Sequence, residues 1–246
     1  MPEFMPPQLG WDIYALAALV IFFAAIVQSS FGMGFGQVAA PFLLLIDPAL
    51  VPVPILFMGM TVACMSAYRG RRDIVYGELG VALGGRLIGI FLAAEVMVIV
   101  MASPHFALVF AGLILFAVAI SLVTKKFQPT PGALFVAGGL SGFMGTITSV
   151  GAPPMGLVYQ SRAAAGVRAT LNAFFGAGTI IALSVLALYG LVKQEHIILA
   201  ITLFPSLLLG TWAARFLFRY IDQQFRPLVL GICATSALVI VYKAVA

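Results

Sequence analysis

Two short, glycine-rich polar stretches interrupt long apolar runs of this chain and limit how it can fold. The first runs from Gln28 to Pro41 and the second from Ser141 to Pro153. In a soluble protein such glycines would lie in surface turns, but here apolar sequence flanks them on both sides. A broken helix inside a membrane is tolerated only where it is buried in protein or lines a cavity. We therefore predict that the two stretches meet near the membrane midplane and form a binding site there.

The composition is typical of a membrane protein rather than a soluble one. Hydrophobic residues make up 63% of the 246 residues and charged residues only 9%, whereas roughly 25% charged residues is usual in soluble domains. We predict an all-α polytopic protein of the cell (inner) membrane, with residues 1–246 forming a single integral membrane domain. The net charge of +5 does not indicate nucleic-acid binding, because the basic residues stand singly or in short clusters between apolar runs, as orientation signals do.

The chain contains an internal repeat. A shift that places Pro41 on Pro153 also places Ser29 on Ser141 and Val38 on Val150. We therefore predict a first repeat over residues 11–124 and a second over residues 132–244. Outside the two polar stretches, the predicted crossings have lengths near the roughly 20 residues that a bilayer needs. They cover residues 53–68, 79–101, 105–123, 169–191, 197–214 and 227–242.

Basic residues predict how the repeats are oriented, because cytoplasmic loops carry an excess of lysine and arginine. We place inside the cell Arg69, Arg71, Arg72, Lys125, Lys126, Arg162, Arg168, Arg215, Arg219 and Arg226. Each polar stretch must then belong to a broken, V-shaped (re-entrant) helical element that enters and leaves on one side. Each repeat is one such element plus three transmembrane helices, and this odd number of crossings makes the two repeats inverted. The alternative is an eight-crossing bundle with parallel halves, which places Arg162 and Arg168 on the wrong face.

The polar stretches contain the groups that an anion site needs. A new half-helix begins near Gln37 and another near Ser149, and a helix N-terminus presents N–H groups and the positive end of a dipole. Glycines let the backbone approach a ligand, and tight helix packing is the alternative explanation for any single one of them. The predicted substrate-binding residues are Ser29, Ser30, Gly32, Gly34, Gly36, Gln37, Pro41, Arg86, Ser141, Gly145, Thr146, Thr148, Ser149, Gly151 and Pro153.

Arg86 is the basic residue that lies well inside a predicted crossing. Charged side chains within membranes are rare and usually functional, so Arg86 could balance the charge of an anion. The alternative is that its long side chain extends to the cytoplasmic interface near Leu79. Glu95 is interpreted as an interfacial residue at the other end of the same helix. The sequence has no hydrolase, nucleotide-binding, zinc-protease or haem motif, so we predict no catalytic residues, no cofactor and no metal site.

The segments SSFGMGFGQVAAPFLLL and GGLSGFMGTITSVGAPP together resemble the duplicated signature of the TauE/SafE sulfite exporter family. The chain length and the Arg168–Thr170 segment also fit, so that the resemblance covers nearly the whole chain. It implies a secondary transporter that exports a small sulfur-containing anion, sulfite or an organosulfonate such as sulfoacetate, by alternating access. An anion channel, or a carrier of small carboxylates or sulfate, is the alternative. Whether the chain forms a homodimer is left open.

The charge pattern predicts that residues 69–72 and 125–126 face the cytoplasm and that both termini lie outside. In a cysteine-free background, a cysteine introduced at Lys125 should not react with a membrane-impermeant thiol reagent in intact cells, and should react once the cells are opened. A cysteine at Lys193, which we place outside, is the matched control and should react in both cases. Labelling at position 125 in intact cells would refute this orientation.

Overall fold

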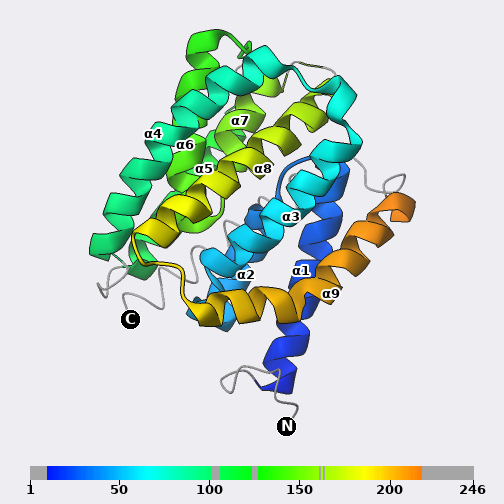
Figure 1. The fold of residues 1–246 in the computed structure, drawn as a ribbon, viewed down its shortest axis with the longest axis vertical. Coiled ribbons are helices and arrows are strands. Elements are labelled where there is room, and N and C mark those ends of the chain that lie inside the picture. Colours follow the sequence, from blue (N-terminus) through cyan, green and yellow to red (C-terminus); the bar gives the residue numbers. More distant parts are fainter. Residues whose placement is uncertain (1–9, 101–105, 124–126, 161, 163, 218–246) are drawn as a thin grey trace.

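A computed structural model describes the chain except residues 1–9, 101–105, 124–126, 161, 163 and 218–246 (Figure 1). The described residues fold into α1 (Trp11–Phe31), α2 (Phe35–Ile46), α3 (Val53–Arg69), α4 (Tyr76–Val100), α5 (Phe106–Leu122), α6 (Pro131–Thr148), α7 (Ala152–Tyr159), α8 (Ala164–Leu188) and α9 (Gln194–Leu217), with short 3-10 turns at Pro48–Leu50 and Arg71–Asp73. The all-α prediction is thus confirmed for this part of the chain. The predicted crossing at 227–242 and the Lys125–Lys126 pair lie outside the described residues.

Six segments of the described chain are long and apolar enough to cross a membrane: Trp11–Phe31, Pro48–Arg69, Tyr76–Val100, Pro131–Thr148, Gly166–Leu188 and Gln194–Phe216. The helices α2 and α5 are apolar but shorter. Large apolar side chains such as Leu92, Ile99 and Leu188 are exposed on the outside of the bundle, and such a surface is typical of lipid contact. The protein is therefore a multi-span membrane protein.

Both predicted helix breaks are present, and both are shorter than predicted. The helix α1 ends at Phe31 and is capped by Gly32, with φ +79°, and α2 begins after Gly34, with φ +108°. In the second stretch α6 ends at Thr148 and is capped by Ser149, with φ +62°, and α7 begins at Ala152. Positive φ is incompatible with a right-handed helix and favours glycine. The polar residues on either side of these positions remain helical, which explains why the breaks are shorter than the polar stretches.

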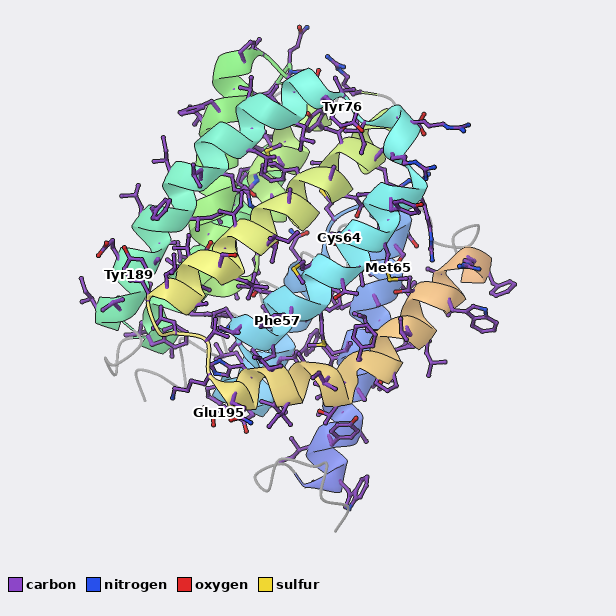
Figure 2. The ribbon with its side chains drawn as sticks, viewed as in Figure 1. Phe57, Cys64, Met65, Tyr76, Tyr189 and Glu195 are labelled. Carbon is purple, nitrogen blue, oxygen red and sulfur yellow. The ribbon has the colours of Figure 1, made fainter. Side chains whose placement is uncertain are left out.

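The long helices pack in three main pairs: α4 lies along α6, α1 along α9, and α3 along α8 (Figure 1). The turn between α3 and α4, the start of α8 and the end of α9 lie together at one end of the bundle, whereas Glu195 lies at the opposite end from Tyr76 (Figure 2). This arrangement gathers the described basic residues Arg69, Arg71, Arg72, Arg162, Arg168 and Arg215 at one end. The grouping agrees with the predicted charge pattern, and the membrane face on which it lies stays a prediction.

The pairing of α4 with α6 depends on glycine. A Cβ atom at Gly85 would lie 1.9 Å from the carbonyl oxygen of Phe135, and one at Gly89 would lie 2.0 Å from that of Gly139. Small residues let membrane helices approach backbone to backbone in this way. The packing explanation for single glycines therefore holds at these two positions, which lie outside both breaks.

Gly85→Ala should destabilise the protein by about 1–3 kcal/mol, because the added methyl group overpacks the contact between α4 and α6. Gly80→Ala, on the same helix, is the matched control: nothing lies within 4 Å of its added Cβ, so this change should leave stability the same or slightly higher. Thermal unfolding of the purified variants in detergent measures the difference. Equal melting temperatures for the two variants would contradict the close approach of these helices.

Candidate functional site

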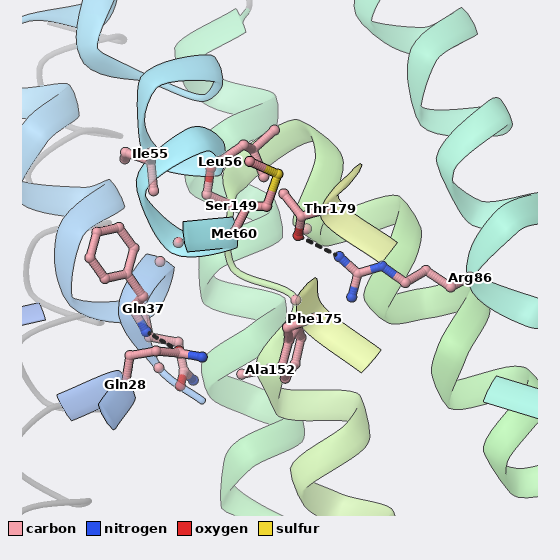
Figure 3. A pocket seen from close by; sticks show the side chains of 16 residues that line it. Gln28, Gln37, Ile55, Leu56, Met60, Arg86, Ser149, Ala152, Phe175 and Thr179 are labelled. Carbon is pink, nitrogen blue, oxygen red and sulfur yellow. Dashed lines mark hydrogen bonds between the residues drawn. The ribbon is translucent and has the colours of Figure 1, made fainter. Parts of the chain in front are cut away.

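Both breaks border one small cavity of about 50 Å³ (Figure 3). Its lining residues come from α1–α4, α6–α8 and both breaks, and they define what we call the central cavity: Gln28, Gly34, Phe35, Gly36, Gln37, Ile55, Leu56, Gly59, Met60, Arg86, Gly145, Ser149, Gly151, Ala152, Phe175 and Thr179. Since one water needs on the order of 10–15 Å³ of such space, the cavity has room for only a few water-sized groups. It is of the size that suits a small anion.

The two polar stretches contact each other directly at Gly36, in the first turn of α2. A Cβ atom there would lie 1.7 Å from the carbonyl oxygen of Ser149, so only glycine fits at this position. The hydroxyl group of Ser149 donates a hydrogen bond to the carbonyl oxygen of Pro52 at 3.2 Å, which joins the second break to the start of α3. The two polar stretches therefore meet, although they lie far apart in the sequence. The depth at which they lie in a bilayer stays a prediction.

Arg86 reaches the central cavity from α4 and is only 2% exposed. Its Nη2 donates a hydrogen bond to Thr179 Oγ1 at 3.2 Å, whereas its Nε and Nη1 have no hydrogen-bond partner. The guanidinium carbon lies 4.6 Å from the ring centre of Phe174 and 5.3 Å from that of Phe175, at distances typical of cation–π contacts. Among the described residues, no carboxylate forms an ion pair with Arg86. The alternative that this side chain extends to the interface is therefore wrong.

The side chain of Gln28 stabilises the backbone conformation of the first break. Its Oε1 accepts a hydrogen bond from the N–H of Phe35 at 3.1 Å, and its Nε2 lies within hydrogen-bond distance of the carbonyl oxygen of Gly32, at 3.3 Å, and of Asn172 Oδ1, at 3.2 Å. The side chain is 3% exposed and lines the central cavity. Gln28 is not among the predicted site residues. Its position at the start of a glycine-rich stretch inside an apolar run is nevertheless a sequence feature that indicates a buried polar site.

The structure places some of the predicted site residues at the central cavity and others away from it. Those that line the cavity are Gly34, Gly36, Gln37, Arg86, Gly145, Ser149 and Gly151. Those that do not are Ser29, Ser30, Gly32, Pro41, Ser141, Thr146, Thr148 and Pro153. Residues of α3 and α8 such as Ile55, Phe175 and Thr179 line the cavity without any local sequence signal, because helix packing alone brings them there.

Several of the predicted hydroxyl donors are engaged within their own element. Thr146 and Thr148 each donate to a carbonyl oxygen one helical turn back at 2.7 Å, a bond that these residues often form inside helices. Ser141 donates to the carbonyl oxygen of Gly151 at 2.6 Å, which ties α6 to the start of α7. These hydroxyl groups therefore stabilise the second broken element and do not point to the central cavity.

The two helix N-termini at the cavity are unequal. Gly36 and Gln37 lie in the first turn of α2, where N–H groups have no partner within their own helix. In α7 the first turn contains Pro153 and Pro154, and proline has no N–H group. We had expected both N-termini to contribute backbone donors. In α2 the N–H of Phe35 already donates to Gln28 Oε1, so Gly36 and Gln37 are the first-turn residues whose N–H groups lie at the cavity, whereas α7 contributes mainly its dipole.

The described helices form a multi-span bundle in which the guanidinium of Arg86 lines a small cavity, and a charged side chain within a membrane protein is rare and usually functional. Residues 17–240 match the family model described as Sulfite exporter TauE/SafE. The chain therefore belongs to the TauE/SafE sulfite exporter family, whose members are transporters and not enzymes, and the resemblance noted in the sequence is confirmed. Searches of curated proteins and of solved structures gave no match.

Gly36→Ala should weaken anion binding and lower stability by about 1–3 kcal/mol, because the methyl group must push the carbonyl of Ser149 away and separate the two breaks. Gly112→Ala, on α5, adds a Cβ with nothing within 4 Å and should leave both properties unchanged. Thermal unfolding with and without added sulfoacetate measures stability and binding together. If Gly36→Ala protein melts and binds like the Gly112→Ala control, the two breaks do not meet as described.

Proposed function

We propose that this chain is a secondary transporter that exports a small sulfur-containing anion, sulfite or an organosulfonate such as sulfoacetate, across the cell membrane. The central cavity is its binding site, and it opens alternately to the two sides. The observation that supports this most is the enclosed guanidinium of Arg86, which lines the cavity between the two breaks and has Nε and Nη1 without a partner. Membership of the sulfite exporter family supports the class of substrate.

The chemistry of Arg86 suits a small monoanion with several oxygen atoms. A guanidinium group has five N–H donors in a planar fork that matches two oxygens of one anion, and only Nη2 is engaged, by Thr179. One positive charge neutralises hydrogen sulfite or a monoanionic sulfonate. Sulfate and fully ionised sulfoacetate each carry a second negative charge, which would have to be protonated or lie at the positive N-terminus of α2, because an unpaired charge in a region with little water is costly. A small carboxylate matches the fork equally well, so carboxylates are the main competing substrates.

The proposal includes the inverted-repeat architecture, with α1–α2 and α6–α7 as the two V-shaped elements. Two observations support it: both breaks line one cavity, and the first turn of α2 contacts the second break at Gly36. In transporters built from inverted repeats, one repeat moves against the other around a fixed site near the midplane. A homodimer is a separate prediction, and the proposed mechanism does not require one.

Counterflow in proteoliposomes tests the proposal and separates it from an anion channel. Vesicles that contain the purified protein and internal sulfoacetate should take up labelled external sulfoacetate in a saturable way. A panel of sulfite, sulfoacetate, taurine, sulfate and pyruvate then ranks the substrates by competition. Uptake that never saturates and shows no counterflow would indicate a channel, and preference for pyruvate would indicate a carboxylate carrier.

Arg86→Ala should lower apparent affinity and transport about ten- to a hundred-fold, because a hydrogen bond to a charged group contributes roughly 1.5–3 kcal/mol. Arg86→Lys, which keeps the charge but loses the fork, should restore part of the loss. Lys193→Ala, at an exposed lysine, is the matched control and should transport normally. Sulfoacetate counterflow of each folded variant is the measurement. Normal counterflow by Arg86→Ala protein would exclude Arg86 from the site.

A further inference from the structure

A second cavity, of about 490 Å³, lies at the basic end of the molecule. Arginine side chains from three different helices line it: Arg69 of α3, Arg168 of α8 and Arg215 of α9. Asp73 is the one acidic residue among its described lining residues. We call this the basic cavity. Its described ionisable side chains therefore give it an excess of positive charge.

The basic cavity also presents neutral hydrogen-bonding groups. Ser29, Ser66 and Thr211 line it, and the hydroxyl oxygen of Ser29 is buried without a hydrogen-bond partner. A concave surface with positive charge and low-dielectric walls raises the local concentration of anions, and guanidinium groups bind oxyanions through charge-assisted hydrogen bonds. The lining therefore has the chemistry of an oxyanion site, with Ser29 as a hydroxyl group that a ligand could satisfy.

One hydrogen-bonded pair joins the basic cavity to the central cavity. Asn172 lines the basic cavity and accepts a hydrogen bond from Gln28 of the central cavity at 3.2 Å. Asn172 also donates to the carbonyl oxygen of Arg168 at 3.0 Å. A Cβ atom at Gly32 would lie 2.7 Å from Arg168 Cγ, so the first break packs against the wall of the basic cavity. The two cavities thus share a wall that includes Gln28 and Asn172.

We infer that the basic cavity is a second anion-binding site, in which a sulfonate or a similar oxyanion is held by Arg69, Arg168 and Arg215. The inference rests on the proposed function, because it gives the transported anion a binding site on the basic end of the protein, next to the central cavity. Binding at this second site does not require Arg86. The two sites can therefore be tested separately.

The test uses a cysteine as a reporter in the basic cavity. Ser66 is half-buried and lines the cavity, so Ser66→Cys is made in full-length protein that carries Cys64→Ala and Cys233→Ala. The protein is kept in detergent, where both ends of the molecule are accessible to reagents. It is treated either with a methanethiosulfonate that carries a sulfonate group or with one that carries a trimethylammonium group. After each rate is normalised to the rate of the same reagent with free cysteine, the anionic reagent should react about ten-fold faster.

Charge-removing variants show whether the cavity itself causes this preference. Arg69→Gln and Arg215→Gln should each lower the anionic preference at Ser66→Cys. Arg72→Gln is the matched control, because Arg72 is exposed at the same end of the molecule but is not among the cavity residues. It should change the preference little, since exposed charges at a distance are screened by salt. A reporter without anionic preference, or an equal effect of all three variants, would overturn the inference.

Ligand protection separates the second site from the central one. Sulfoacetate, compared with chloride at the same ionic strength, should slow labelling of Ser66→Cys, and should do so equally in an Arg86→Gln background. Protection that disappears with Arg86→Gln, or no protection in either background, would contradict a second site. If Arg86→Gln protein shows normal counterflow while protection persists, the proposed central site fails and the basic cavity remains an anion site.

Discussion

The central cavity contains a positive charge that is buried inside a membrane protein, and the rest of the site must stabilise that charge. Arg86 is almost fully buried, and no described carboxylate pairs with it. Removing an unpaired charge from water is costly, and the hydroxyl of Thr179 and the faces of two phenylalanine rings offset only part of that cost. A bound anion would supply the missing opposite charge. The arrangement therefore favours a cavity that is occupied by an anion.

The packing around Arg86 explains why glycines matter even where they touch no ligand. A Cβ atom at Gly178 would lie 2.1 Å from Arg86 Nε, and one at Gly142 would lie 2.4 Å from the Arg86 carbonyl oxygen. A side chain at either position would displace the arginine from α6 or α8. Packing and binding are thus not competing explanations for these glycines, because close packing is what holds the charged group at the cavity.

The sequence was sufficient to predict the breaks but not which side chains face the cavity. Glycines and hydroxyl groups are conspicuous inside apolar runs, so both interruptions and their contact could be predicted. The direction of a side chain depends on helix packing and rotamer, and these follow from the whole fold. For this reason Thr146 and Thr148 were predicted at the site although they bond within α6, whereas Phe175 and Thr179, on an ordinary apolar helix, were not predicted.

The unequal helix N-termini give Arg86 a specific place in the architecture. The Pro153-Pro154 pair, already visible in the sequence, removes backbone donors from the first turn of α7. The first turn of α2 contains no proline, and one of its N–H groups, that of Phe35, donates to Gln28. Gln37 of α2 and Arg86 extend toward the cavity from opposite sides (Figure 3), and Arg86 packs against α6, which belongs to the same broken element as α7. A fixed cation and the donor-poor start of α7 therefore line the same cavity. In the proposed site an anion lies between a helix N-terminus and a guanidinium and needs few hydroxyl groups, which is consistent with the bonds that Thr146 and Thr148 make within α6.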